Sequence, residues 1–253
     1  MPEPLRVNDA TVDHIEDGIY RIRIMTPDAP ISFNQFLIDD ERPALIHTGM
    51  FPMYDQVRES VAEVLDPASI RYVCIGHFEA DECGGMHRFV DEAPQAELVC
   101  SMVGAFVSLE QWDYDGEVHA VQDGDQIDLG RHTLQFWETP HVHHWDSMMV
   151  VEEETKSLFP ADLFMQPGEQ PAVSDEDLGD EMCGMYRDIG IFAHEDPVLD
   201  VVDRIEEYGP RLVHPMHGAS FRGESLPDYI EALRSQPFAF EGKVFGEPIP
   251  HAH

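Results

Sequence analysis

Short apolar runs separated by turn residues recur along the chain, and their spacing predicts both strands and helices. Residues Ile19 to Ile24 alternate apolar and polar side chains, which is the period of a strand with one buried face. From Tyr54 to Leu65 the apolar positions instead follow a helical spacing, which Pro67 ends. The same reasoning predicts further strands over 31–38, 44–47, 72–75, 97–100, 126–129, 133–137, 147–151, 157–159 and 211–213, and further helices over 85–92, 101–111, 198–208 and 227–234.

The order of these elements indicates an α/β protein. A block of strands comes first, then alternating strands and helices, a second block of strands, and a final helix–strand–helix segment. Two mixed sheets packed between two helix layers, a four-layer αβ/βα sandwich, would bury every apolar face. No linker rich in Ser, Gly or Pro and no internal repeat divides the sequence, so we expect one domain over residues 1–253.

The charge balance narrows the choice of partners. The formal net charge is -35, and Lys156 and Lys243 are the only lysines beside thirteen arginines. Such a surface repels nucleic acid and anionic membranes, so neither is an expected partner. The balance suits a protein kept soluble at high salt, or equally an acidic protein from an arginine-preferring genome.

Other bulk properties favour a protein of the cytoplasm. Hydrophobic residues make up 43% of the chain, which supports a sizeable core, but no apolar run is long enough to span a membrane. No basic and apolar leader opens the sequence, so we expect a cytoplasmic protein. The four cysteines are scattered without a C-x-x-C pair, which predicts reduced thiols.

The polar segment after the predicted strand 72–75 is the most distinctive in the chain. It reads Gly76-His77-Phe78-Glu79-Ala80-Asp81-Glu82 and offers one imidazole and three carboxylates. In an extended backbone His77, Glu79 and Asp81 would project to one side, because side chains alternate along a strand. This oxygen-rich set favours iron or manganese over zinc.

Three further segments place metal-binding side chains at or soon after predicted strand ends. Residues 140–146 contain His141, His143 and His144, Asp162 follows the strand 157–159, and His217 follows the strand 211–213. An isolated aspartate or histidine at such a place is ordinarily a turn residue. The joint occurrence of all four segments predicts a metal site.

These motifs resemble the metallo-β-lactamase superfamily, and within it the diiron domain of flavodiiron proteins and of stand-alone oxygen-binding diiron proteins. The hydrolases of the superfamily favour His-x-His-x-Asp-His in the first motif, and a glutamate at the second histidine, here Glu79, marks the diiron branch. Residues 140–148, 160–162 and 215–218 resemble further motifs of that branch. The resemblance spans nearly the whole chain and implies a metallo-β-lactamase-like fold, here without a flavodoxin domain.

The resemblance also implies a pair of metal ions, with iron preferred and manganese or zinc as alternatives. One ion would bind His77, Glu79 and His143, and the other Asp81 and His217, with Asp162 bridging the two. His143 is favoured among the three neighbouring histidines because it keeps Pro140 and residues 146–148 in register with the family motif.

Two positions depart from the family pattern. Glu82 stands where a second-iron histidine is usual, and it could bind metal, hydrogen-bond a water or point away. His47 stands where an aspartate usually supports the metal-binding loop. His141 and His144 are expected to support or gate the site rather than bind metal.

The remaining histidines are expected outside the site. His214 is predicted to be a core or loop residue at a strand end, and the tail histidines His251 and His253 could bind metal adventitiously. Surface-like contexts without a role are predicted for five others: His14, His87, His119, His132 and His194.

The leading hypothesis is a non-haem diiron protein that binds or reduces O2 or NO, with electrons from a separate donor, or that acts as an oxygen sensor. The alternative is a metal-dependent hydrolase of phosphoesters, lactones or thioesters, since carboxylates can also hold hydrolytic metals. A degenerate, mainly structural member of the superfamily is a third reading. We also expect a homodimer.

Overall fold

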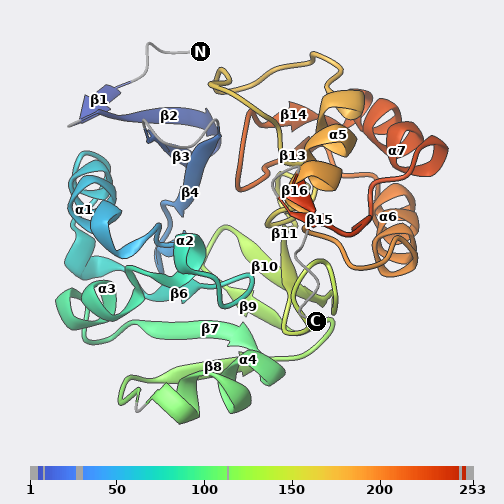
Figure 1. Cartoon of the computed structure of the whole chain (residues 1–253). Coiled ribbons are helices and arrows are strands. Elements are labelled where there is room, and N and C mark those ends of the chain that lie inside the picture. The colour runs from blue at the N-terminus through green and yellow to red at the C-terminus, as the bar shows by residue number, and fades with distance from the viewer. Residues whose placement is uncertain (1–4, 8, 27–30, 113, 245–246, 249–253) are drawn as a thin grey trace.

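Two β-sheets form the centre of the molecule, and helices cover the outer face of each (Figure 1). The structure is a computed structural model, and it describes residues 5–7, 9–26, 31–112, 114–244 and 247–248. The arrangement is the four-layer αβ/βα sandwich that the order of elements predicted.

The first sheet has eight strands, which neighbour one another in sequence order. They are β1 (Leu5–Val7), β2 (Ala10–Glu16), β3 (Ile19–Met25), β4 (Ser32–Ile38), β5 (Ala44–Ile46), β6 (Tyr72–Cys74), β7 (Glu97–Ser101) and β8 (Val118–Val121). Pairing is antiparallel from β1 to β5 and parallel from β5 to β8, so the sheet is mixed.

The second sheet has six strands in the order β14-β13-β12-β11-β10-β9. They are β9 (Gln126–Asp128), β10 (Thr133–Glu138), β11 (Met148–Glu152), β12 (Ser157–Phe159), β13 (Leu212–Val213) and β14 (Phe221–Arg222). Among the described strands of this sheet, β12 and β13 pair in parallel and the other neighbours are antiparallel. A separate hairpin joins β15 (Lys243–Val244) to β16 (Glu247–Pro248).

Helices fall into two groups according to the sheet they cover. The α-helices are α1 (Tyr54–Ala62), α2 (Ala80–Cys83), α3 (Met86–Glu92), α4 (Met102–Val107), α5 (Gly179–Ile189), α6 (Asp196–Tyr208) and α7 (Leu226–Ser235). The short 3-10 helices are η1 (Phe51–Met53), η2 (Pro67–Ser69), η3 (Leu109–Trp112) and η4 (Gly223–Ser225). Buried residues of α1 and α3 pack on the first sheet, and those of α5, α6 and α7 pack on the second.

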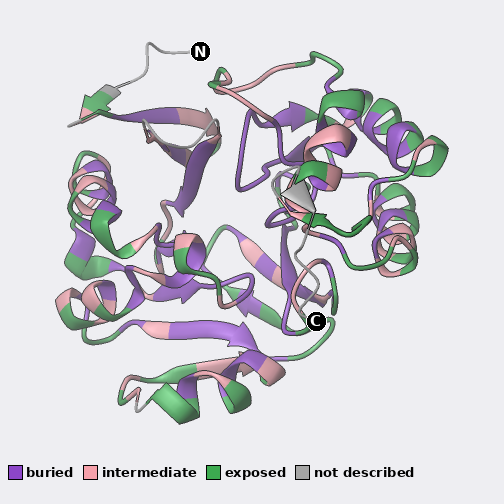
Figure 2. Cartoon of the chain, viewed as in Figure 1, coloured by how far each residue is buried: buried purple, intermediate pink, exposed green. Residues whose placement is uncertain are grey.

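A third apolar cluster lies between the sheets and joins the two halves. Phe36 of β4 meets Phe159 of β12 with ring centroids 5.2 Å apart, and Ile46 and Val150 belong to the same cluster. Figure 2 shows buried strands inside and exposed outer helix faces. Because the sheets are fixed to one another, the loops at their ends are held in one place.

Several elements differ from the sequence-based expectation. The strand β2 and the helix α5 were not predicted, and the helix predicted over 101–111 is divided into α4 and η3. His47, expected at the end of a strand, lies just beyond β5 with a φ of 64°. No helix among the described residues is long and apolar enough to cross a membrane.

Candidate metal centre

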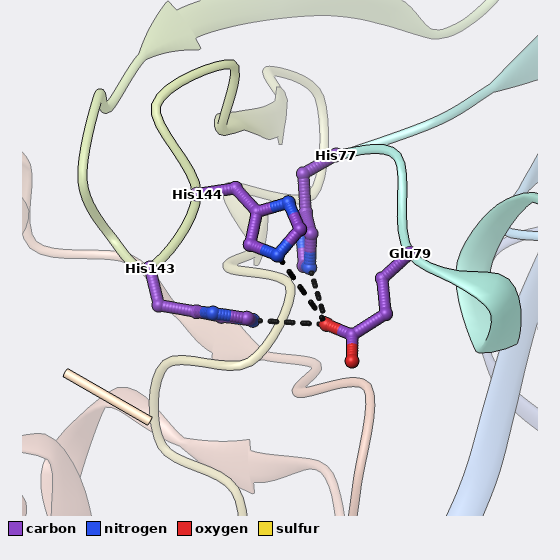
Figure 3. Close-up of side chains that lie close together, drawn as sticks. All are labelled: His77, Glu79, His143 and His144. Atoms are coloured by element: carbon purple, nitrogen blue, oxygen red, sulfur yellow. Dashed lines mark hydrogen bonds and ion pairs between the residues drawn. The ribbon is translucent and has the colours of Figure 1, made fainter. Parts of the chain in front are cut away.

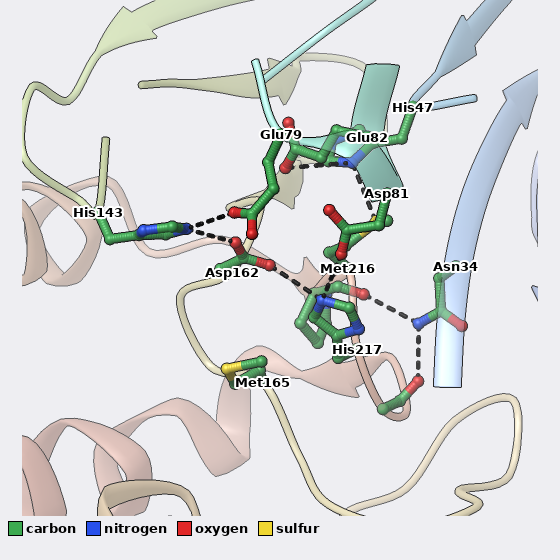
Figure 4. Close-up of polar contacts among 12 residues, drawn as sticks. Asn34, His47, Glu79, Asp81, Glu82, His143, Asp162, Met165, Met216 and His217 are labelled. Carbon is green, nitrogen blue, oxygen red and sulfur yellow. Dashed lines mark hydrogen bonds and ion pairs between the residues drawn. The ribbon is translucent and has the colours of Figure 1, made fainter. Parts of the chain in front are cut away.

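All six predicted metal ligands meet at one edge of the two sheets. Figure 4 labels Glu79, Asp81, His143, Asp162 and His217, and Figure 3 labels His77 beside Glu79 and His143. The segment containing His77, Glu79 and Asp81 follows β6 of the first sheet. The other three predicted ligands come from the second sheet: His143 from the β10–β11 loop, Asp162 after β12, and His217 after β13. The site therefore lies where both sheets end, as the strand-end motifs predicted.

One group of side chains surrounds the carboxylate of Glu79. Its Oε2 lies 3.2 Å from His77 Nε2 and 3.2 Å from His143 Nε2. Asp162 Oδ2 approaches the same two nitrogens, at 3.4 Å from His77 and 2.9 Å from His143. These donor atoms converge on one small volume.

His144 belongs to this group more closely than the sequence indicated. Its ring lies 4.6 Å from those of both His77 and His143, and its Nε2 points to Glu79 Oε2 at 3.9 Å (Figure 3). The opposite ring nitrogen, Nδ1, lies 3.6 Å from Asp146 Oδ1, which orients the ring. His77, Glu79, His143 and His144 each offer one donor atom, and these four atoms lie within 4.8 Å of one another. His141, by contrast, is exposed.

A second group forms around His217, on the other side of Asp162. His217 Nε2 lies 3.1 Å from Asp162 Oδ1 and 3.5 Å from Asp81 Oδ2. The two carboxylate oxygens of Asp162 thus face histidines from two different loops, His143 and His217. This is the geometry of a carboxylate shared between two neighbouring positions.

The chain reaches these positions by a different path from the extended one expected. Only residues 72–74 form the strand β6, and α2 begins at Ala80 after Glu79, whose backbone is still extended. Asp81 and Glu82 lie in the first turn of α2, where the partial positive charge of a helix N-terminus favours carboxylates. The helical turn sends Asp81 and Glu82 in different directions.

Glu82 points into the protein, towards the back of His77. Its side chain is buried, with Oε1 3.2 Å from His77 Nδ1 and 3.3 Å from His47 Nδ1. His47 also lies beside the sulfur of Met216, at 3.0 Å. Both residues that depart from the family pattern are therefore in contact with each other.

Residues of the first sheet hold the loop that carries His217. The backbone carbonyl of Ser32 lies 2.6 Å from His217 Nδ1, and Asn34 Nδ2 donates to the carbonyls of Pro215 and Gly218. Arg21, fully buried beside Asp13, also donates to the Gly218 carbonyl. Sequence reasoning missed these supports, although the polar residues within strands β3 and β4 were a weak signal of them.

The electrostatics fit a site built to receive cations. Burial alone would lower the histidine pKa values, but the carboxylates outweigh it. They raise the pKa of His143 to about 9 and that of His217 to about 10, and the pKa of His77 lies well above its ordinary value. Burial would raise the pKa of Asp162, but His143 and His217 hold it well below its usual range. The protonated imidazoles thus balance the negative charge of the carboxylates, as bound metal ions would.

A pocket of about 480 Å³ opens onto the site. Its polar floor consists of Glu79, Asp81, His143, Asp162 and His217. Its rim is apolar and comprises Ile31, Met165, Ile189, Ile191 and Val244. A small neutral molecule could therefore reach the polar cluster through an apolar entrance.

The other histidine predictions have mixed outcomes. His214 is a buried core residue as expected, stacked on Phe159 at 4.8 Å, and burial lowers its pKa to about 3. The surface-like context expected for His132 is wrong, because its side chain is buried and its Nδ1 lies 2.7 Å from Asp40 Oδ2. The tail histidines His251 and His253 lie outside the described residues.

A family model described as ODP family beta lactamase matches residues 31–218. The chain belongs to this family. The matched segment begins just before β4 and ends just after His217, so it contains all six predicted ligands. The resemblance inferred from the motifs is confirmed.

This ODP family chain is similar in sequence to several curated proteins. A flavo-diiron protein of Clostridium acetobutylicum is 30% identical over 162 residues, covering 59% of this chain and 40% of the relative. Rubredoxin-oxygen oxidoreductase of Megalodesulfovibrio gigas is 26% identical, covering 81% and 54%. Nitric oxide reductase of Moorella thermoacetica is 27% identical, covering 76% and 50%. The chain thus spans about half the length of these relatives.

Solved structures agree on the fold. The structure of rubredoxin oxygen:oxidoreductase from Desulfovibrio gigas superposes with a TM-score of 0.79 at 24% identity. The match covers 89% of this chain and 62% of that one. The metallo-β-lactamase-like sandwich expected for this ODP family chain is confirmed.

Proposed function

We propose that this chain is a non-haem diiron protein that binds O2 or NO and reduces it with electrons from a separate donor. Two relatives carry names that state oxygen or nitric oxide as the molecule acted on, and one of these names also includes rubredoxin. The oxygen-rich donor set at the site suits iron better than zinc. The apolar rim of the pocket suits a small neutral molecule.

The position of Asp162 is the observation that carries this proposal. One carboxylate oxygen faces His143 and the other faces His217. We propose that Asp162 bridges two irons, with His77, Glu79 and His143 on the first and with Asp81 and His217 on the second. A mononuclear site would give the second oxygen and Asp81 no metal to bind.

The distances between donor atoms agree with this assignment. Two ligands on one metal are at most about 4.6 Å apart, since each bond is about 2.0–2.3 Å long. One donor atom from each of His77, Glu79 and His143, together with one from His144, lies within 4.8 Å of the others, which is close to that limit. Bound iron would supply the electrons and the binding position for the diatomic molecule.

The protein's part is to fix the donors and control access. Carboxylates stabilise the more highly charged ferric state, so Glu79, Asp81 and Asp162 would lower the reduction potential. Buried Met165 and the isoleucines of the rim leave a small molecule a largely apolar path. A homodimer and a cytoplasmic location remain predictions, which size-exclusion chromatography and cell fractionation would test.

Anaerobic purification followed by metal analysis tests the proposal. We expect about two irons per chain, an optical change when oxygen or nitric oxide is added to the reduced protein, and consumption of the gas with a reduced donor present. An oxygen-binding sensor would show the optical change without turnover. A protein that loads zinc rather than iron and cleaves a generic ester would instead support the hydrolase alternative.

A further inference from the structure

His47 and Glu82 form a buried pair behind the metal centre. Their closest atoms, His47 Nδ1 and Glu82 Oε1, lie 3.3 Å apart. Only 4% of His47 and none of Glu82 is exposed. A carboxylate without contact to water is costly unless other groups stabilise it, so its partners indicate its role.

The backbone holds the two residues together. The N–H and the hydroxyl of Thr48 both donate to the carbonyl of Glu82, at 2.7 and 2.9 Å. The same hydroxyl accepts a bond from the N–H of Gly85 at 3.0 Å. The loop after β5 is therefore fixed to α2, which keeps the backbones of His47 and Glu82 close together.

The Glu82 carboxylate also holds His77. Its Oε2 accepts a hydrogen bond from the His77 backbone N–H at 2.6 Å, and its Oε1 lies 3.2 Å from Nδ1 of the ring. Gly76 makes room for this approach, because a Cβ there would lie 3.1 Å from Oε2. The opposite ring nitrogen, Nε2, faces Glu79 and Asp162.

We propose that Glu82 is a positioning residue that fixes His77 and is not a ligand of the second metal. His47 in turn holds Glu82. This inference rests on the proposed metal site, and it leaves Asp81, Asp162 and His217 as the protein ligands of the second metal. The two metals then differ: the first has two imidazoles and two carboxylates, whereas the second has one imidazole and two carboxylates and so keeps room for an added molecule.

A carboxylate behind a metal-binding histidine fixes the orientation of the ring and raises its basicity. Loss of such a partner typically lowers metal affinity by about 10- to 100-fold. Glu82→Gln keeps the size of the side chain but removes its charge. We expect this variant to lower the affinity for the first metal by about that factor and to change the absorption spectrum of Co(II) bound there.

A variant that lacks the second metal position distinguishes between two possible roles of Glu82, support of His77 and binding of the second metal. His217→Ala removes the imidazole of the second metal, and Co(II) titration then reports on the first metal alone. If Glu82 acts through His77, Glu82→Gln weakens Co(II) binding equally with His217 present or absent. If Glu82 binds the second metal, its effect disappears in the His217→Ala background, which would overturn the inference.

A double-mutant cycle tests the part of His47. In the parent protein, His47→Gln should lower the affinity for the first metal. It should have little further effect once Glu82→Gln is present, because His47 acts through Glu82. If the losses of metal affinity in the two single variants simply add in the double variant, His47 does not act through Glu82. A parent protein that binds no metal would refute the proposed function itself, whereas normal metal binding with an inert Glu82→Gln would refute only this inference.

Discussion

Tyr186 on α5 donates a hydrogen bond from its phenol to the backbone carbonyl of Asp162, at 3.1 Å. The phenol oxygen of Tyr186 in turn accepts a hydrogen bond from the N–H of Met165, at 3.2 Å. Tyr186 is fully buried, so one helix residue spans and fixes the loop that carries the proposed bridging carboxylate. Tyr186 thus packs in the core behind α5 and also supports the Asp162 loop.

The Tyr186→Phe variant should therefore affect both stability and metal binding. Loss of the hydroxyl leaves a buried carbonyl and a buried N–H without this partner, which should cost about 1–3 kcal/mol of unfolding free energy. Tyr229→Phe is a matched control, because Tyr229 donates to the backbone carbonyl of Glu176, which is not a proposed ligand. Chemical denaturation should show losses in both variants, but only Tyr186→Phe should weaken metal binding. Equal metal affinity in the two would mean that the Asp162 loop needs no such support.

Asp162 and Asp81 should give different results when each is changed to alanine. Asp162→Ala removes a carboxylate from both metal positions, so the second metal should be lost and the first weakened. Asp81→Ala should affect the second metal alone, because Asp81 contacts His217 and not the histidines around Glu79. Metal analysis after equilibrium dialysis would measure both. An unchanged stoichiometry in Asp162→Ala would make this residue an ordinary turn residue.

His144 should act as an additional donor to the first metal rather than as a gate. Its Nε2 is directed at Glu79, and Asp146 lies behind its Nδ1. We expect His144→Gln to lower affinity for the first metal by about 10-fold or more and to shift the Co(II) spectrum. His141→Gln is the control, because His141 is exposed and should leave both unchanged. A His144 variant that alters only the rate of gas binding would indicate a gate.

Metal binding should become stronger as the pH rises towards about 9. In the metal-free protein the pKa of His143 is raised to about 9 and that of His217 to about 10, so both carry protons at neutral pH. A metal must displace those protons, and its apparent affinity therefore falls as the pH decreases. Calorimetry in buffers of different ionisation enthalpy should detect the release of at least one proton per metal at pH 7. No proton release would contradict this account.

The sequence could predict the ligands better than their surroundings. His77, Glu79, His143 and the others follow strand ends in recognisable motifs, so their convergence was predictable. The direction of Glu82 was not, because it depends on where α2 begins: a helical turn at Ala80 sends Asp81 to the pocket and Glu82 behind His77. The sequence alone does not indicate which of the carboxylates of Glu79, Asp81 and Glu82 points into the protein.

The elements that were missed have physical explanations. The strand β2 places Thr11 and Asp13 in buried positions, and Asp13 is tolerated there because it pairs with Arg21. Its polar residues concealed the strand pattern. The helix α5 contains Gly179 and Gly184, which are poor helix formers, and it is stabilised by packing on the second sheet. Local propensity could reveal neither the pairing of Asp13 with Arg21 nor the packing of α5.

The division of the ligands between the two sheets has a consequence for how the protein matures. Asp81 belongs to the segment after β6, whereas His143, Asp162 and His217 all come from the second sheet. Neither half alone has the full set of proposed ligands, so we expect metal acquisition to follow the docking of the two halves. The proposed second ion would then cross-link Asp81 and His217, which lie more than a hundred positions apart in the chain. The loaded protein should consequently open its two halves far more slowly than the newly folded one.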